Sequence, residues 1–223
     1  MILFLDLETT GLESNDKIIS IALLGEDFEV YELVNDGKKI PPLASSINHI
    51  TNEMIKNKPK LKDSEAYKLL QKNNNEDTVI IGHNVKFDLQ KLSEYGFNFK
   101  GEVLDTLRVT KHLIPECEIF SLQVLRYELK LYKQEKETLY AHNALDDAKV
   151  IKNLYDYLLD LQSTKKMIEL SKKNVLMQKF DFGKYNSKYI EDIAMNDKSY
   201  LQWLLLNVED LDEDLRYSIN YYL

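Results

Sequence analysis

The sequence predicts an α/β fold followed by a smaller helical unit. Strand and helix patterns alternate through residues 1–105, and helical spacing dominates the chain after them. A lysine-rich segment, residues 165–178, then precedes a short stretch with apolar positions of its own, residues 179–223. The chain has 223 residues, of which 44% are hydrophobic, and this is enough to bury the core that such a fold needs.

Five segments carry strand patterns. The first is an apolar run that Asp6 interrupts, the second is rich in β-branched residues, and the third alternates apolar and polar positions. Gly11 and the polar residues after it predict a turn between the first two, so the first three strands are expected to form a meander. The expected strands are residues 2–7, 17–24, 28–34, 78–81 and 102–104.

Helical patterns fill most of the remaining chain. Pro41 and Pro42 are interpreted as a break, Gly96 as the end of one helix and Ser121 as the cap of another. A long amphipathic helix is expected from Ala144 until it fades near Ser163. The expected helices are residues 51–56, 64–71, 87–95, a stretch after 104, a stretch from 121, and 144–162.

The composition predicts a cytoplasmic protein without a membrane span. A single cysteine, Cys117, allows no internal disulfide, which is typical of a reducing compartment. The N-terminus lacks the basic region of a signal peptide, and Asp6 interrupts its apolar run. No segment approaches the apolar length that a membrane helix requires.

Charge is unevenly distributed along the chain. Its net charge is −8, which weakens the case for a nucleic-acid partner because phosphates attract basic surfaces. Residues 165–190, however, hold seven lysines against Glu169 and Asp181, a net charge of +5 that leaves −13 for the remainder. The lysines alternate with aromatic residues, a composition that single-strand binders share with ordinary solvated linkers. The basic and aromatic residues are Lys165, Lys166, Lys172, Lys173, Lys179, Lys184, Lys188, Phe180, Phe182, Tyr185 and Tyr189.

Two carboxylates, Asp6 and Glu8, lie two residues apart on the first expected strand. Side chains at that spacing point to the same face of a sheet. The apolar residues around them predict a central strand, where two neighbouring carboxylates repel each other unless a cation lies between them. The pattern therefore indicates a divalent metal site.

Asp88, Asp147 and His142 are further candidates for the site. Asp88 follows the fourth expected strand, and Asp147 begins the long helix five residues after His142. An acid in the first turn of a helix is also common for structural reasons, because the helix dipole stabilises it. Since each of these residues lies near a strand end or a helix start, we expect them to converge as α/β sites do. Asp146 is the neighbouring alternative to Asp147.

Three motifs resemble those of the DEDDh 3′→5′ exonucleases. Residues 4–12 (FLDLETTGL), 82–88 (GHNVKFD) and 142–148 (HNALDDA) match the family's motifs in order, and residues 47–55 resemble its stretch between the first two. The resemblance covers about residues 1–162. Residues 182–185, 200–205 and 212–217 resemble the small C-terminal domain of exodeoxyribonuclease X-like proteins. The expected domains are therefore an exonuclease domain (1–164), a lysine-rich linker (165–178) and this small domain (179–223).

The resemblance implies a ribonuclease H-like fold, a mixed sheet flanked by helices, with two Mg²⁺ or Mn²⁺ ions. Asp6, Glu8 and Asp147 are then expected to hold one ion, Asp6 to bridge to the second, and Asp88 to assist. His142 is implied as the general base. The resemblance also implies that residues 9–12 bind the terminal nucleotide: Thr9, Thr10, Gly11 and Leu12, of which Leu12 is the candidate for stacking on a base.

The implied activity is 3′→5′ hydrolysis of DNA that releases nucleoside 5′-monophosphates, in repair or end trimming. A proofreading subunit of a replicative polymerase and a 3′→5′ exoribonuclease remain open, because the motifs are common to all three. A non-catalytic nucleic-acid-binding module is disfavoured by the complete set of Asp6, Glu8, Asp88, His142 and Asp147.

Overall fold

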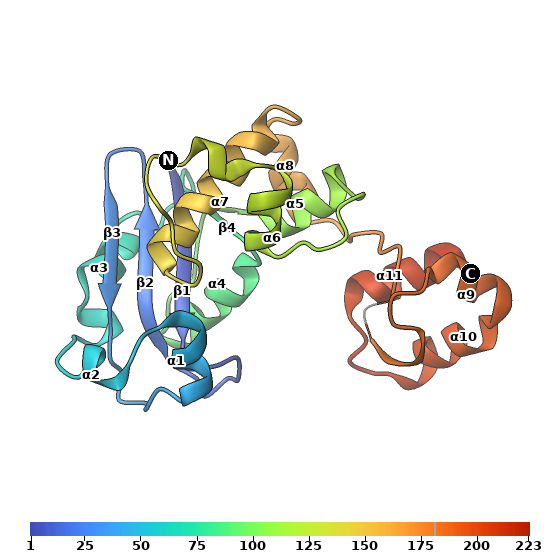
Figure 1. The fold of residues 1–223 in the computed structure, drawn as a ribbon, viewed down its shortest axis with the longest axis horizontal. Helices are drawn as coiled ribbons and strands as arrows, with labels where there is room; N and C mark the ends of the chain where they lie inside the picture. The colour runs from blue at the N-terminus through green and yellow to red at the C-terminus, as the bar shows by residue number, and fades with distance from the viewer. Residues whose placement is uncertain (181) are drawn as a thin grey trace. The chain divides into compact units, whose positions relative to one another are not determined.

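The computed structural model describes residues 1–180 and 182–223, so Asp181, counted above among the acids, lies outside the described residues. The chain forms two compact units, Met1–Ser171 and Lys172–Leu223. Figure 1 shows the first as a sheet with helices and the second as a cluster of helices.

The first unit is built on a five-stranded mixed sheet of order β3-β2-β1-β4-β5. The first three strands form the expected antiparallel meander, and the last two pair in parallel beside β1. The strands are β1 (Ile2–Thr9), β2 (Ile18–Leu24), β3 (Glu29–Leu33), β4 (Val79–Gly82) and β5 (Glu102–Asp105). The predicted central position of the first strand is thus confirmed.

Helices cover both faces of the sheet (Figure 1). Leu3 and Leu5 point to one face, where they pack with residues of α3 (Glu65–Lys72) and α4 (Val85–Glu94). Phe4 points to the other face and meets the Tyr155 ring of α7 (Ala144–Leu159) edge to face, with ring centroids 5.6 Å apart. Because side chains alternate along a strand, Asp6 and Glu8 share the face of Phe4 and therefore point to the side of α7.

Shorter helices complete the first unit. They are α1 (Pro42–Asn48), α2 (Asn52–Ile55), α5 (Thr106–Leu113), α6 (Leu122–Glu128) and the 3-10 turns η1 (Leu61–Asp63) and η2 (Leu131–Gln134). The interpretation of Pro41 and Pro42 as a break missed α1, in which Pro42 occupies the first helical position, where its missing N–H costs nothing. Ser121 does precede α6, but its side chain makes no capping hydrogen bond.

The expected linker is divided between the two units. Its first residues form α8 (Thr164–Ser171), whose Met167 is fully buried and whose Ser171 hydroxyl accepts a hydrogen bond from the Asp105 amide at 2.9 Å. The residues after α8 belong to the second unit, where the Val175 amide donates to the Asp214 carboxylate at 2.9 Å. The division between the units therefore falls after Ser171, because Met167 supplies an apolar anchor among the lysines.

The second unit is a small helical cluster with its own core. It contains η3 (Gly183–Tyr185), α9 (Ile190–Asn196), α10 (Lys198–Asn207) and α11 (Glu213–Tyr222). Its buried residues include Phe180, Ile190, Leu201, Leu215 and Ile219. None of the described helices in either unit is long and apolar enough to cross a membrane.

Candidate active site

Asp6 and Glu8 project from the centre of the sheet. They lie on β1 opposite Ala22 and Ser20 of β2, and these small neighbours leave room above the strand for the two carboxylates. Burial, and then the charges of Asp88, Asp147 and Glu8, raise the pKa of Asp6 well above its usual value. Burial and the nearby Asp147 raise the pKa of Glu8 to about 8, against a smaller opposing effect of a hydrogen bond from Asn48.

Asp147 lies in the first turn of α7, directly beside Glu8. Asn143 caps this helix by accepting hydrogen bonds from the Leu145 and Asp146 amides at 3.1 and 3.3 Å. One oxygen of Asp147 accepts from the His142 amide at 2.9 Å and the other from the Gln123 side chain at 2.5 Å. Burial raises the pKa of Asp147 to about 6, although these hydrogen bonds lower it.

His142 is exposed and has a left-handed backbone, with φ 61°. A possible ligand atom from each of Glu8, His142 and Asp147 lies within 4.8 Å of the other two. The chain therefore brings together residues that are up to 139 positions apart. The alternative, Asp146, is turned to a different partner, because its carboxylate accepts from the Tyr140 amide at 2.8 Å.

Asp88 is almost fully buried and lies in the first turn of α4, the helix that packs on the face of the sheet opposite to α7. Burial raises its pKa well above the usual value, and the charges of Asp105 and Glu8 act in the same direction. Asp105 is itself held by the Asn84 amide at 2.9 Å. The four predicted acids thus interact with one another electrostatically, and a cation among them would relieve their repulsion.

Three residues near the site were not predicted. Gln123 and Asn48 donate hydrogen bonds to Asp147 and Glu8, and Asp105 acts on Asp88. Asn48 lies in the segment 47–55 that resembles the family, so a signal for it was available. Gln123 lies inside an ordinary amphipathic pattern, and nothing in that pattern distinguishes it.

The loop after β1 begins two residues after Glu8. The Thr9 hydroxyl donates to the Gly11 carbonyl at 2.7 Å, and the Thr10 hydroxyl donates to Asp16 at 2.7 Å. A Cβ atom at position 11 would collide with the Asp16 carboxylate, which explains the glycine. Leu12 is 82% exposed at the tip of the loop, so its side chain is free to meet a ligand.

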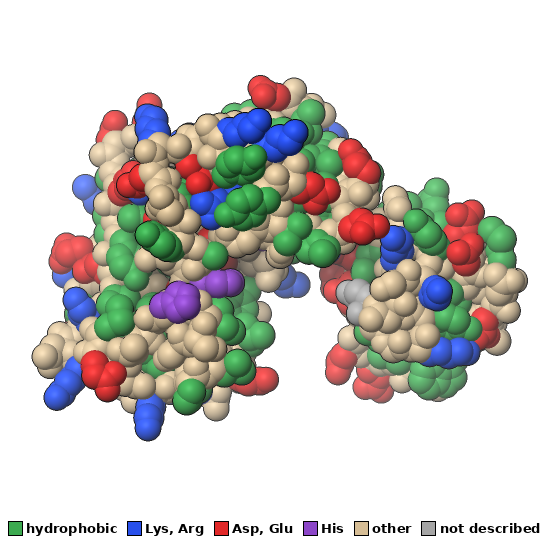
Figure 2. Space-filling view, in the orientation of Figure 1, with side chains coloured by type: hydrophobic (Ala, Val, Ile, Leu, Met, Phe, Trp, Pro, Cys, Tyr) green, Lys and Arg blue, Asp and Glu red, His purple; other side chains and the backbone are tan. Residues whose placement is uncertain are grey.

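The residues present fit a divalent metal ion. Hard cations prefer oxygen ligands, and four carboxylates, whose pKa values are raised first by burial and then by neighbouring charges, provide them beside one imidazole. Binding of a cation favours the deprotonated form of these groups, so metal binding and the loss of their protons are linked. Figure 2 shows that histidine side chains are accessible on one face of the first unit.

The mixed sheet and its carboxylates define a nuclease of the ribonuclease H-like class. Similarity to known protein families identifies the family. The model of the family described as Exonuclease matches residues 3–155, and the chain belongs to this family. A second family, described as Exodeoxyribonuclease X-like C-terminal, matches residues 180–209. The predicted family, fold and hydrolytic activity are confirmed, and such exonucleases depend on divalent metal ions.

Individual relatives agree with this assignment. The chain is 29% identical over 238 residues to Exodeoxyribonuclease 10 of Escherichia coli K12, covering 100% of this chain and 99% of that protein. It is 30% identical over 164 residues to DNA polymerase III subunit epsilon of Treponema pallidum, covering 69% and 74%. The structure of exonuclease X in complex with 5′ overhanging duplex DNA superposes with a TM-score of 0.62 at 25% identity, covering 77% of this chain and 99% of that one.

Proposed function

We propose that this exonuclease degrades DNA from the 3′ end, releases nucleoside 5′-monophosphates and works in repair or end trimming in the cytoplasm. The observation that carries the proposal is the convergence of Glu8, His142 and Asp147 on the side of the sheet to which Asp6 also points. Similarity to Exodeoxyribonuclease 10 over both units supports DNA as the substrate. The similarity to the polymerase subunit covers 69% of the chain, and a proofreading role is therefore the second candidate.

Asp6, Glu8, Asp88 and Asp147 would hold two divalent ions, Mg²⁺ or Mn²⁺. When bound, such ions stabilise the attacking and leaving oxygens of an in-line displacement at phosphorus. His142 is exposed beside Glu8 and Asp147, where its imidazole can accept a proton from the attacking water. The Gln123 amide and the His142 backbone amide fix the orientation of the Asp147 carboxylate. Thr9, Thr10, Gly11 and Leu12 would receive the terminal nucleotide.

The first prediction is that hydrolysis starts at the 3′ end and requires a divalent metal ion. Single-stranded DNA, duplex DNA and RNA carrying a 5′ label are incubated in parallel with the purified protein and Mg²⁺. We expect labelled ladders that shorten from the 3′ end, unlabelled nucleoside 5′-monophosphates that chromatography detects separately, and no cleavage in excess EDTA. Hydrolysis that persists in EDTA would contradict the mechanism. Faster degradation of RNA than of DNA would show that RNA is the preferred substrate.

The second unit is proposed to anchor the DNA strand. Of the four aromatic residues among the lysines, Tyr189 and Phe182 are 48% and 42% exposed, whereas Phe180 is buried in the core. The Lys179 ammonium lies 5.0 Å from the centre of the Tyr189 ring, so charge and a stacking surface occur together. Basic side chains are visible on the face of this unit in Figure 2. Tyr185 instead donates a hydrogen bond to Asp197 at 2.7 Å.

The second prediction is that neutralising this basic surface weakens the salt dependence of DNA binding. In the Lys179→Gln/Lys188→Gln variant, the slope of log affinity against log salt should fall by about 0.7 for each lost phosphate contact on single strands. Affinity is measured at several salt concentrations in an Asp6→Asn background, which prevents degradation. The matched control is Lys62→Gln/Lys72→Gln, two exposed lysines of the first unit. Equal slopes in both double variants would locate the binding surface elsewhere.

A further inference from the structure

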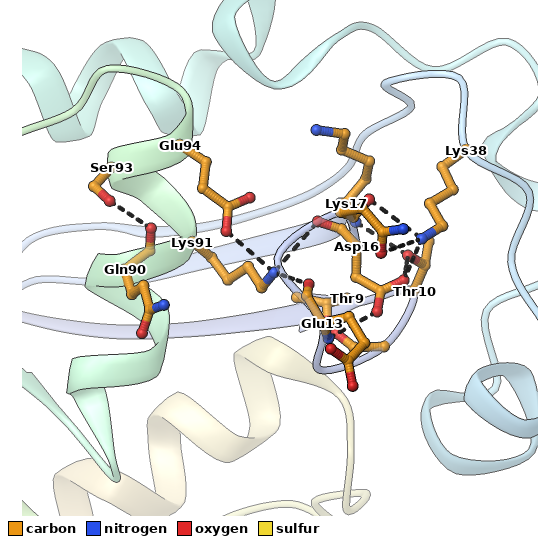
Figure 3. Close-up of polar contacts among 12 residues, drawn as sticks. Thr9, Thr10, Glu13, Asp16, Lys17, Lys38, Gln90, Lys91, Ser93 and Glu94 are labelled. Atoms are coloured by element: carbon orange, nitrogen blue, oxygen red, sulfur yellow. Dashed lines mark hydrogen bonds and ion pairs between the residues drawn. The ribbon is translucent and has the colours of Figure 1, made fainter. Parts of the chain in front are cut away.

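The loop between β1 and β2 is held by a buried charged network that no step of the mechanism uses. Lys91 and Asp16 are only 2% and 6% exposed, although charged side chains seldom lie in protein interiors. Figure 3 shows the Lys91 side chain reaching the loop from α4, while Lys38 approaches from the other side. The loop between these two cations comprises residues 10–16 and is called the β1–β2 loop below.

Asp16 organises the β1–β2 loop from within. One of its oxygens accepts from the Thr10 hydroxyl at 2.7 Å and from the Lys38 ammonium at 2.6 Å. Its other oxygen accepts from the Glu13 amide at 2.9 Å. The Lys38 ammonium also donates to the backbone carbonyl and the side chain of Asn15, each at 3.2 Å. Both ends of the loop are thereby closed onto one carboxylate.

Lys91 ties the β1–β2 loop to the helix that carries Asp88. Its ammonium donates to the carbonyls of Glu13 and, at 3.5 Å, Asp16, and it lies 3.3 Å from the Glu94 carboxylate. Lys91 follows Asp88 by three residues on α4, so the two side chains belong to neighbouring turns of one helix. The loop itself continues from the end of β1, which carries Asp6 and Glu8. One lysine thus links the loop after β1, the strand of Asp6 and Glu8, to α4, the helix of Asp88.

The interior location of Lys91 favours a specific role. Burying an ammonium group costs free energy, and an apolar side chain of similar volume often stabilises a fold at least as well. A buried charge of this kind can instead select one arrangement of the backbone, because its hydrogen bonds are satisfied only there. The arrangement selected here presents the exposed Leu12 at the end of the strand that carries Glu8.

We propose that Lys91, together with Asp16 and Lys38, positions the β1–β2 loop. The loop in turn holds the terminal nucleotide so that its phosphodiester lies beside the carboxylates. This inference rests on the proposed function, in which residues 9–12 receive the terminal nucleotide. A displacement of about 1 Å of a positioning element can lower a rate about 10²-fold. The effect should therefore lie in kcat, while the remainder of a long strand continues to be bound.

The test combines hydrogen exchange with kinetics on the full chain. For Lys91→Met we expect faster amide exchange in residues 9–17 and a kcat about 10- to 100-fold lower on a single-stranded DNA oligonucleotide. KM should change less than about threefold, as should Mn²⁺ affinity measured by calorimetry, because the ligands stay in place. Lys38→Met should show a smaller loss of the same kind, and Lys38→Arg should restore it by renewing the ion pair with Asp16. Lys72→Met, an exposed lysine on α3, is the control.

Several results would overturn the inference. Unchanged kcat in a variant with a loosened loop would show that its position does not matter, and lowered kcat with unchanged exchange would assign the loss to another cause. Lower Mn²⁺ affinity would mean that Lys91 acts through Asp88, and a loss confined to KM would make the loop a binding element only. If Lys91→Met does not fold, the kcat values and exchange rates of Lys38→Met and Lys38→Arg test the inference instead. Absence of cleavage by the unmodified protein would instead contradict the proposed function.

Discussion

Replacing Asp6 by asparagine is expected to lower kcat at least about 10³-fold, because loss of a shared metal ligand removes several kcal/mol of transition-state stabilisation. Asp6 lies on the central strand, and burial, followed by the charges of Asp88, Asp147 and Glu8, raises its pKa. The measurement is single-turnover cleavage of labelled single-stranded DNA at saturating Mg²⁺. The matched control is Asp146→Asn. The Asp146 carboxylate accepts a hydrogen bond from the Tyr140 amide and should be dispensable for cleavage. Cleavage by Asp6→Asn at the unmodified rate would contradict the proposed site.

The same substitution should stabilise the metal-free protein. A carboxyl group whose pKa is raised by folding favours the folded state below its unfolded pKa, and that contribution is lost as pH rises through the folded pKa. Because the pKa of Asp147 rises from 3.8 to about 6 and that of Glu8 from 4.5 to about 8, the metal-free protein should lose stability between about pH 4 and pH 8. Asp6→Asn should reduce this loss, since it removes a buried carboxyl group whose own pKa is raised by folding. Melting temperatures of both proteins, measured over this pH range in EDTA and in Mg²⁺, test the loss of stability and its reduction in Asp6→Asn. A lower melting temperature of Asp6→Asn than of the unmodified protein in EDTA would refute the prediction.

Sequence patterns predicted the helices and strands that bury one apolar face. They failed for residues whose burial depends on contacts with distant parts of the chain. The alternation around Asp6 and Glu8 predicted both the central strand and the shared direction of these side chains. The helix α8 was interpreted as linker because its lysines outweigh Met167, whose burial depends on β5 and α5. The network around Lys91 has no local signal at all, because a lysine in an amphipathic helix is normally exposed. Its partners, Glu13 and Asp16, lie 78 and 75 residues away in sequence.

In the candidate site, too, some residues could be predicted from local sequence patterns and others could not. Its five chemical groups could be predicted because their types and spacing match one chemistry. The residues that orient them, Gln123 and Asn48, are amides that serve many structural purposes, so only their position relative to Asp147 and Glu8 distinguishes them. The spacing of the third motif already favoured Asp147 over its neighbour Asp146, and in the structure Asp147 lies with Glu8 and His142 while the Asp146 carboxylate accepts from the Tyr140 amide.

Removing the imidazole of His142 is expected to lower kcat by about 10²- to 10⁴-fold while metal binding persists. The side chain is exposed next to Glu8 and Asp147, where it can take a proton from the attacking water without being a necessary ligand. His142→Gly is the informative variant, since φ is 61° at this position and glycine adopts that backbone without strain. The rate is measured at saturating Mg²⁺ over a range of pH, and Mn²⁺ binding is measured by calorimetry.

Chemical rescue separates proton transfer from a structural role. The position is open to solvent, so added imidazole can enter the space left in His142→Gly and restore part of the rate. A general base acts in its unprotonated form, and the restored rate should therefore rise with pH as the added imidazole loses its proton. His142→Asn serves as the control, because asparagine tolerates the left-handed backbone but fills the space without a basic nitrogen. Full activity of His142→Gly without imidazole would show that this histidine accepts no proton in the reaction.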